Sequence, residues 1–269
     1  MAGAVPEERV TLPIATQTWR DMTFLHWPFE PELLQGRIPA GTTLDLWDGA
    51  AWVGLTPFVM QDLRVGGFPS PVPRLRFPET NLRTYIRGPD GRDGIWFLSL
   101  EAGSLLTTVA ASLAFGVPYR WARMRVERQG KRVTYQSTRR CGARAGHRIE
   151  VTTGDQLDAG ELDHWLTGRW RAWTTIAGRL ADVPVEHEPW TLLGGTAVVE
   201  ESLLAAAGLP PPSAPALVHA SPGVDARLGR PRFRWTAHEH LVLDARAGLR
   251  RRPILPPKAV VPRVPPRPR

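Results

Sequence analysis

The sequence has only one cysteine and two lysines among its 269 residues. It also lacks the features that mark a secreted or membrane protein. The single thiol, Cys141, rules out an intramolecular disulfide framework and fits a reducing compartment. No apolar run approaches the ~20 residues that a membrane-spanning helix needs. The N-terminus lacks the basic and then apolar order of a signal peptide. We therefore expect a soluble, cytoplasmic protein that does not enter a membrane.

An excess of basic charge is missing from most of the chain, although the formal net charge is +8. Residues 231–269 hold ten basic and two acidic side chains, so residues 1–230 keep 24 of each sign. The balanced body has no electrostatic basis for binding nucleic acid. Residues 231–269 also hold eight prolines without a steady period, which predicts a basic, proline-rich disordered tail.

The common catalytic and metal-binding signatures are absent as well. The body has no G-x-S-x-G, Walker or G-x-G-x-x-G element, and its histidines make no metal-ligating set. His238 and His240 form an H-E-H triplet, but it falls in the predicted tail. Cys141 has no convincing histidine partner, so we interpret it as incidental. We expect neither a metal nor a cofactor.

Short alternating segments separated by glycine and proline make up most of the chain. They predict strands at 42–47, 51–60, 77–86, 95–100, 119–128, 132–140, 144–151, 170–176, 180–186, 190–200 and 217–227. Helical patterns are fewer, at 19–27, 30–34, 102–115, 158–166 (with Asp158 as N-cap and Glu161 in a capping box) and 200–207. The fold class is therefore mainly β (α+β), an antiparallel barrel or curved sheet with a few short helices. Residues 1–12 are predicted as a flexible leader and residues 13–230 as one domain.

The segment FPETNLRTYI carries the strongest candidate site. Glu79, Asn81, Arg83 and Tyr85 alternate along it and share one strand face. If that face lines a cavity, Arg83 can hold a carboxylate or carbonyl, with Glu79 as proton acceptor and Tyr85 as donor. The alternative is an ordinary solvated face on which Arg83 neutralises Glu79.

Further candidates come from the flanking segments. Tyr119 follows a helix-ending Gly-x-Pro and can act as an acid/base phenol or as a donor to an oxyanion, and His26 can be an acid/base group. The alternative for each is a packed structural side chain. Tyr135 and Arg139 are added as ligand-binding candidates. The hairpin register places both of them on the face opposite to that of Tyr119. The two tyrosines can therefore share a cavity only if a bulge intervenes.

Several motifs in order carry a resemblance to a known family: FLHW, FPETNLRTYI, GIWFLSL, GVPYRWARM, YQSTRR and SPGVDARLGRP. Over about residues 13–231 they resemble the YqjF family, which is defined by the DUF2071 domain. That family is similar to the acetoacetate decarboxylase-like superfamily. The resemblance implies a curved antiparallel sheet closed into a cone or barrel around a central cavity.

The resemblance also bears on the chemistry. The decarboxylase forms a Schiff base with a lysine in a G-F-P-K segment, and here the matching residues are Gly116-Val117-Pro118-Tyr119. The two lysines, Lys131 and Lys258, fall in a predicted turn and in the tail. The resemblance therefore implies that Schiff-base decarboxylation is absent, and that Glu79 matches a cavity glutamate.

These observations support two main hypotheses. The first is a protein that binds a small polar or carboxylated molecule in an internal cavity. The second is an enzyme of hydratase, dehydratase or hydrolase type, with Glu79 and either Tyr119 or His26 as acid/base groups. A third, a structural assembly protein, predicts a filled interior. A homo-oligomer is compatible with the sequence.

Overall fold

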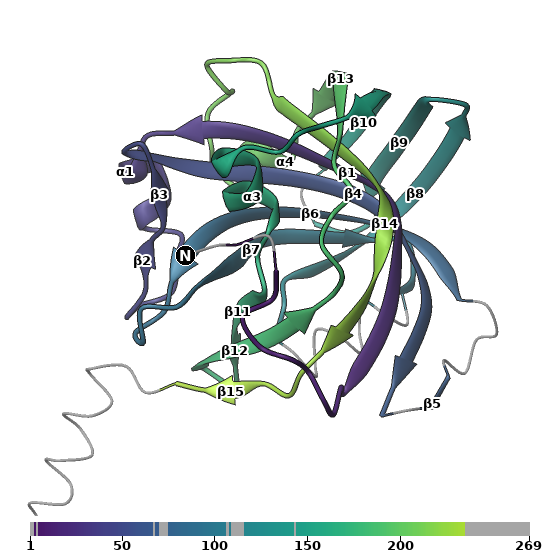
Figure 1. Cartoon of the computed structure of the whole chain (residues 1–269). Helices are drawn as coiled ribbons and strands as arrows, with labels where there is room; N and C mark the ends of the chain where they lie inside the picture. The colour runs from purple at the N-terminus through teal and green to yellow at the C-terminus, as the bar shows by residue number, and fades with distance from the viewer. Residues whose placement is uncertain are drawn as a thin grey trace, which may run out of the picture. The chain divides into compact units, whose positions relative to one another are not determined.

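Strands dominate the computed structural model, which describes residue 3 and residues 5–66, 68–69, 75–105, 108, 116–142 and 144–234 (Figure 1). The strands are β1 (Ala15–Phe29), β2 (Thr43–Leu44), β3 (Leu46–Trp47), β4 (Ala50–Val65), β5 (Phe68–Pro69), β6 (Arg76–Arg87), β7 (Asp93–Ala102), β8 (Tyr119–Gln129), β9 (Arg132–Arg139), β10 (Gly146–Gln156), β11 (Arg171–Ile176), β12 (Arg179–Glu186), β13 (Leu193–Glu201), β14 (Leu217–Leu228) and β15 (Arg232–Phe233). The helices are α1 (Pro31–Gln35), α3 (Glu161–Thr167) and α4 (Leu203–Ala206).

One 15-stranded sheet runs through these residues and closes on itself twice. The β6–β7 pairing closes a ring of nine strands in the order β7-β8-β9-β10-β13-β14-β1-β4-β6. The β12–β14 pairing closes a second ring, β7-β11-β12-β14-β1-β4-β6. Most pairings are antiparallel, but β7 lies parallel to β8 and to β11. The predicted mainly β fold, a sheet closed into a barrel with few helices, is confirmed.

Strands β14, β1, β4, β6 and β7 belong to both rings, and we call them the shared wall. Residues 53–60 of β4 and 79–86 of β6 are buried without interruption, because a wall between two rings is covered on both faces. Strands β9 and β10 instead alternate buried with less buried residues, as strands do when one face meets solvent.

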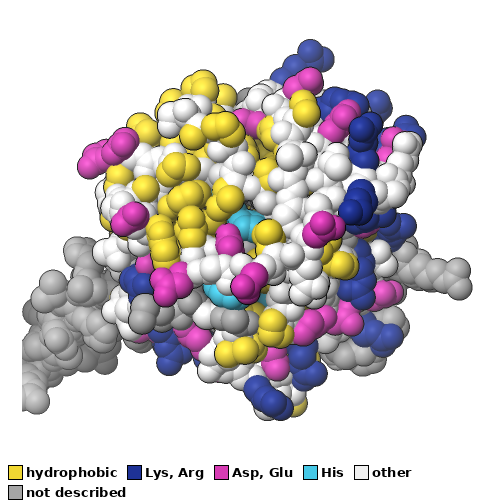
Figure 2. All heavy atoms as spheres, turned by 45° about the horizontal axis from the view of Figure 1, so that its top comes forward, with side chains coloured by type: hydrophobic (Ala, Val, Ile, Leu, Met, Phe, Trp, Pro, Cys, Tyr) yellow, Lys and Arg dark blue, Asp and Glu magenta, His cyan; other side chains and the backbone are white. Residues whose placement is uncertain are grey.

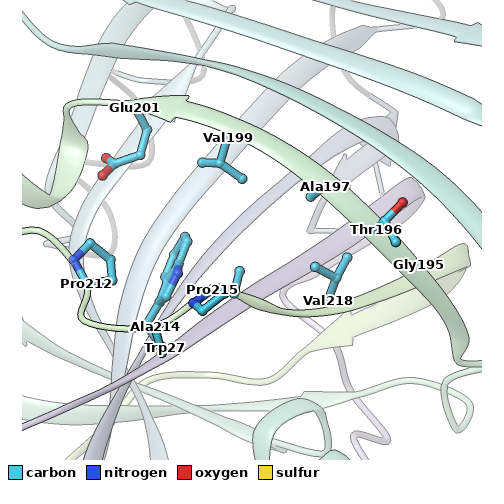
Figure 3. Close-up of a pocket in the computed structure, with 11 residues that line it drawn as sticks. Trp27, Gly195, Thr196, Ala197, Val199, Glu201, Pro212, Ala214, Pro215 and Val218 are labelled. Atoms are coloured by element: carbon cyan, nitrogen blue, oxygen red, sulfur yellow. The ribbon is translucent and has the colours of Figure 1, made fainter.

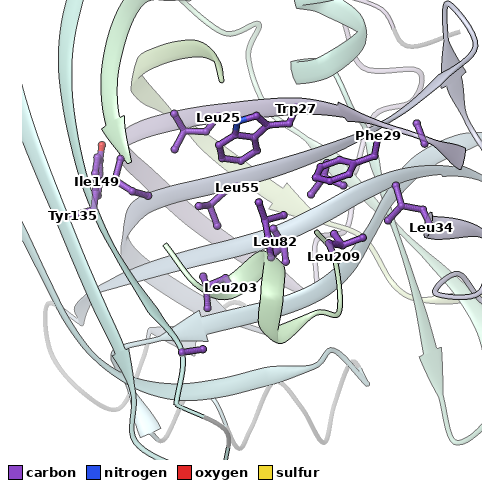
Figure 4. Packing of buried hydrophobic residues seen from close by; sticks show 14 of the residues in the cluster. Leu25, Trp27, Phe29, Leu34, Leu55, Leu82, Tyr135, Ile149, Leu203 and Leu209 are labelled. Carbon is purple, nitrogen blue, oxygen red and sulfur yellow. The ribbon is translucent and has the colours of Figure 1, made fainter. Parts of the chain in front are cut away.

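The nine-strand ring encloses an apolar core (Figure 4). Leu25, Leu55 and Leu82 of the shared wall meet Tyr135 of β9 and Ile149 of β10 there, and all five are at most 1% exposed. Leucines of α1 and α4 complete the cluster. Each fully buried leucine of this kind contributes about 1.5–3 kcal/mol to folding. Figure 1 shows α3, β11 and β12 on one side of the shared wall and β8–β10 on the other.

The helix predicted over residues 19–27 is wrong, because this segment lies in the middle of β1. It pairs with β14 on one edge and with β4 on the other. Leu25 and Phe29 belong to the barrel core, whereas Met22 packs in a different cluster. Burial of both faces places apolar residues at odd and even positions, and their spacing then imitates a helix.

Two predicted hairpins are confirmed by their pairings. Asp48 and Gly49 both have positive φ, 53° and 79°, which is the geometry of a tight two-residue hairpin turn. Residues 42–47 nevertheless form two short strands, since β2 pairs with β6 and β3 with β4. The β8–β9 register is the predicted one, with Val126 opposite Tyr135.

Two helix predictions need comment. Helix α3 begins at Glu161 with Gly160 as N-cap, so Asp158 is not the cap, and Glu161 is not the capping-box residue. The Gly160 N–H instead donates to Asp163 Oδ2 at 2.8 Å. Most of the helix predicted over residues 102–115 lies outside the described residues. Its first residue, Ala102, is described and is the last residue of β7.

Described residues of the segment predicted as a flexible leader, residues 1–12, make hydrogen bonds to the rest of the chain. The carbonyl of Gly3 accepts the Nε1–H of Trp170 at 2.8 Å. Val10 is buried, and its N–H donates to Glu186 Oε2 at 2.6 Å. The segment is therefore held by the second ring.

The segment predicted as a disordered tail, residues 231–269, contains the short strand β15 near its start. Strand β15 pairs with β12. Arg232 and Arg234 both donate to Asp182, whose carboxylate is fully buried. Burial alone would raise the pKa of Asp182, but the hydrogen bonds and charges of Arg234 and Arg232 hold it below its usual range. Residues 235–269 lie outside the described residues.

Candidate functional site

Four polar side chains of β6 lie on the face of the shared wall that looks into the second ring. Glu79, Asn81, Arg83 and Tyr85 are 3%, 6%, 7% and 1% exposed, so the alternative of a solvated strand face does not hold. Glu79 pairs with Ala102 of β7, which packs with Tyr119 in an apolar cluster distinct from the barrel core. The alternation predicted from the sequence thus places these four side chains together.

Strand pairing orders the neighbouring residues in rows. His26 of β1, Gly54 of β4 and Arg83 of β6 are direct partners in one row. Thr56 of β4 pairs with Asn81 in the next row. We call His26, Thr56, Glu79, Asn81 and Arg83 the polar floor.

Glu79 contacts Tyr119 rather than Arg83. The Tyr119 hydroxyl donates to Glu79 Oε2 at 3.0 Å. Burial raises the pKa of Glu79 to about 8, and the tyrosine hydrogen bond opposes this only in part. Burial and the adjacent carboxyl group raise the pKa of Tyr119 well above its ordinary value. The pair therefore holds a carboxyl proton near neutral pH, with the phenol as a neutral donor.

The backbone before Tyr119 explains its position. Gly116 has φ 63°, and a Cβ there would lie 2.0 Å from the carbonyl oxygen of Thr175 in β11. Only glycine allows this approach. The chain then continues into β8, where Tyr119 pairs in parallel with Leu100 of β7.

Arg83 is a buried cation without an anionic partner among the described residues. Its Nε and Nη2 atoms are buried and make no hydrogen bond there. Its guanidinium lies 5.4 Å from the ring centre of Phe24 and 5.9 Å from that of Tyr85. Such cation–π contacts offset only part of the cost of burying a charge.

His26 is fully buried and bonded to Tyr85. Its Nε2 atom lies 2.7 Å from the Tyr85 hydroxyl, which also contacts the carbonyl oxygen of Leu166 at 2.8 Å. Burial first, and the Arg83 charge second, hold the pKa of His26 well below its usual value, so the ring is neutral. Gly54 makes room for this pair, since a Cβ there would lie 3.0 Å from His26 Cδ2.

Aromatic side chains pack against Phe24, whose ring stacks on His26 of the polar floor with 6.2 Å between ring centres. Trp190 lies 5.1 Å from Phe24 and 4.5 Å from His187, measured between ring centres, and stacks on Trp19 at 6.2 Å. Burial lowers the pKa of His187 to about 4, so it adds no charge. We call Trp19, His187 and Trp190 the aromatic roof.

Sequence reasoning missed Thr56 and the aromatic roof. Thr56 is fully buried, and its Oγ1 makes no hydrogen bond within the described part of the chain. Period-2 alternation along β4 would have found it, because Gly54 and Thr56 share a face. The roof could not be found in this way, because its members come from segments far apart in the sequence.

The placement predicted for Tyr135 and Arg139 is corrected. Tyr135 lies in the barrel core and donates to the carbonyl oxygen of Asp21. Arg139 binds the buried carboxylate of Glu101 through Nε and Nη2, at 3.0 and 2.7 Å to Oε1. Glu101 pairs with Thr80, which alternates with Glu79 and so points to the other ring. The shared wall therefore separates both residues from the polar floor.

No lysine reaches the floor among the described residues. Lys131 lies in the β8–β9 turn with its side chain 69% exposed, and its Nζ is 3.4 Å from Asp155 Oδ1. Lys258 lies outside the described residues. The described residues also contain no cluster of three potential metal ligands, and Cys141 is an exposed free thiol.

A separate pocket of about 500 Å³ opens where β13 leaves β14 (Figure 3). The two strands pair only at residues 193–194 of β13. Trp27, Val199 and Val218 line the pocket, and its one carboxylate, Glu201, caps the N–H of Leu204 at 2.9 Å. The pocket holds none of the residues of the polar floor.

One face of the molecule and the helices complete the picture of the surface. On the face in Figure 2, histidine and acidic side chains emerge together between an apolar region on one side and lysine and arginine side chains on the other. None of the helices in the described part of the chain is long and apolar enough to cross a membrane.

Comparison with known proteins identifies the family. The DUF2071 family, described as an uncharacterised conserved protein, matches residues 16–225. YqjF of Bacillus subtilis (strain 168) is 32% identical over 228 residues, which cover 81% of this chain and 93% of that protein. An acetoacetate decarboxylase-like enzyme from Sphingomonas wittichii RW1 matches with a TM-score of 0.62 at 15% identity, covering 83% of this chain and 94% of that one.

Two further solved structures agree in fold. Acetoacetate decarboxylase from Legionella pneumophila gives a TM-score of 0.61 at 13% identity, over 84% of this chain and 88% of its own. MppR, an enduracididine biosynthesis enzyme, gives 0.61 at 14% identity, over 84% and 93%. Taken together, the motifs, the doubly closed sheet and these matches show that the chain belongs to the DUF2071 family and has the acetoacetate decarboxylase-like fold.

Proposed function

We propose that this protein binds a small carboxylate in the second ring, between the polar floor and the aromatic roof. One observation carries the proposal, namely that the buried guanidinium of Arg83 has no anionic partner among the described residues. An unpaired buried charge costs several kcal/mol, which a bound anion would offset.

The unpaired atoms have the geometry that a carboxylate needs. Nε and Nη2 lie along one edge of the guanidinium and form a two-donor fork. The same chain shows this fork in use, because Arg139 binds Glu101 through the same two atoms. Unlike Arg139, Arg83 has no protein carboxylate beside it among the described residues, and in this proposal the ligand supplies one. The fold suits such a ligand, since MppR, which shares it, is described in complex with pyruvate.

A second candidate, an acid/base enzyme, draws on the Glu79–Tyr119 pair. A carboxyl group with a pKa of about 8 can both give and take a proton near neutral pH. Asn81 lies between it and Arg83 on the same face, so a ligand held by Arg83 would have to pass Asn81 to reach Glu79. A hydratase, dehydratase or hydrolase step would then use Glu79 as the proton carrier and Tyr119 as a donor.

The experiment compares carboxylates with their neutral amides by thermal shift. We expect at least one short-chain carboxylate to stabilise the wild type, and its carboxamide not to. At a hundredfold excess over Kd the gain is about 2.7 kcal/mol. Arg83→Gln, which keeps much of the length without the charge, should remove the shift. Equal shifts with the amide, or an unchanged shift in Arg83→Gln, would remove Arg83 as the anchor.

The enzyme candidate is tested on the same ligands. NMR of each bound acid should show its conversion by the wild type and none by Glu79→Gln, with binding retained in the variant. Binding without conversion of any acid in the wild type favours the first candidate.

A further inference from the structure

The hydrogen-bonding state of His26 follows from its two neighbours. The Tyr85 hydroxyl has one proton, and the Leu166 carbonyl can only accept, so Tyr85 donates to Leu166. The 2.7 Å contact between Tyr85 and His26 then requires His26 Nε2 to carry a proton and donate it. In the neutral ring Nδ1 is therefore a bare acceptor, and this buried atom has no partner among the described residues.

Two more unmet groups stand in the adjacent row. Asn81 Oδ1 is a buried acceptor without a hydrogen bond, and Thr56 Oγ1 is a buried hydroxyl without one. Neighbouring strands lie about 4.8 Å apart, and same-face residues about 6.6 Å apart. The backbone positions of His26, Arg83, Thr56 and Asn81 therefore span roughly 10 Å across the strands and 7 Å along them. The Tyr85 hydroxyl lies within this span, above Gly54.

The unmet donors and acceptors of the polar floor match one chemical class of ligand. Arg83 offers donors to a carboxylate, whereas His26 Nδ1 and Asn81 Oδ1 require donors from the ligand. A hydroxyl group supplies such a donor and a ketone does not. An ammonium group also donates, but it would lie beside the Arg83 cation, and Glu79 is held neutral near pH 7.

We propose that the polar floor selects short-chain hydroxycarboxylic acids over the corresponding keto acids. The inference rests on the proposed carboxylate function and deepens it. A hydroxy acid can donate its one hydroxyl proton to either His26 Nδ1 or Asn81 Oδ1, whereas a keto acid leaves both unpaired. The loss of that hydrogen bond lowers affinity roughly 5- to 100-fold.

The test measures matched pairs by calorimetry at neutral pH: lactate with pyruvate, malate with oxaloacetate, and 3-hydroxybutyrate with acetoacetate. In the wild type at least one hydroxy acid should bind roughly tenfold or more tightly than its keto partner. Thr56→Val and Asn81→Leu remove unmet polar groups, so both should fold, and His26→Gln removes the Nδ1 acceptor but keeps an amide N–H that can donate to Tyr85. At least one of these three variants should bring the ratio close to one. Thr84→Val is the matched control for Thr56→Val. Thr84 lies on the strand face opposite to the polar floor, and its Oγ1 donates to the Trp52 carbonyl oxygen. This variant should keep the affinity ratio of the wild type.

The outcomes separate the two proposals. Equal or tighter binding of the keto acids in the wild type overturns the selectivity and leaves the carboxylate function standing. A preference that survives in all three floor variants overturns the assignment to this floor. Failure of every acid in the panel to bind, together with no carboxylate shift in the amide comparison, overturns the proposed function itself.

Discussion

Replacing Arg83 by methionine should stabilise the protein when no carboxylate is present. The exchange removes a 7% exposed charge whose Nε and Nη2 have no partner among the described residues, and keeps a long apolar side chain beside Phe24. Burying the charge costs several kcal/mol. The contacts with Phe24 and Tyr85 return about 0.5–2 kcal/mol each. We therefore expect a gain of about 1–4 kcal/mol.

Arg139→Met is the matched control. Arg139 is also largely buried, but its fork holds the fully buried carboxylate of Glu101. Removing it leaves an uncompensated charge, and the expected loss is about 3–5 kcal/mol. The two variants thus change stability in opposite directions, although the exchange is chemically the same.

Urea unfolding in a buffer free of small carboxylates measures both variants, and thermal unfolding supports it. For a domain of this size each kcal/mol shifts Tm by about 2–4 °C. If Arg83→Met loses stability to the same degree as Arg139→Met, Arg83 already has a partner in the folded chain, and the reasoning from its unpaired atoms is refuted.

Two further predictions concern the polar floor. Burial raises the pKa of Glu79 from 4.5 to about 8, so the carboxyl group loses its proton at a lower pH in the unfolded chain than in the folded chain. The folded state therefore loses stability as the pH rises between these two values. The loss is about 1.4 kcal/mol for each unit of pKa difference. Glu79→Gln should therefore gain stability relative to the wild type in urea unfolding as pH rises from about 5 to about 8, and a constant difference contradicts the raised pKa. Gly54→Ala should cost about 1–3 kcal/mol, since its Cβ would lie 3.0 Å from His26 Cδ2, whereas the control Gly36→Ala meets nothing within 4 Å. Equal stability of the two alanine variants would show that the His26 ring is free to move.

Much of the candidate site could be predicted because it depends on one strand. Alternation in FPETNLRTYI was enough to place Glu79, Asn81 and Arg83 on one face, and the structure keeps them there. The contact of Tyr119 with Glu79 was not predicted, although both residues were candidates. Its cause is non-local, since Gly116 packs against β11 and lets β8 begin beside β7.

Two of the failures follow from the wall that the two rings share. A wall shared by two rings buries both faces of its strands, so the period-2 signal disappears, and residues 19–27 imitate a helix. Alternation also tells which residues share a face, but not which ring that face enters. Arg139 and Tyr135 were misplaced for this reason. Their partners, Glu101 and Asp21, lie far away in sequence and are brought close only by strand order.

A crystal structure of the protein with a bound hydroxy acid tests the central claim most directly. We predict that the two carboxylate oxygens lie about 2.7–2.9 Å from Nε and Nη2 of Arg83. The hydroxyl should face His26 Nδ1 or Asn81 Oδ1. An acid found in the pocket lined by Trp27 and Val218, with the Arg83 fork filled by a protein carboxylate instead, would contradict the account.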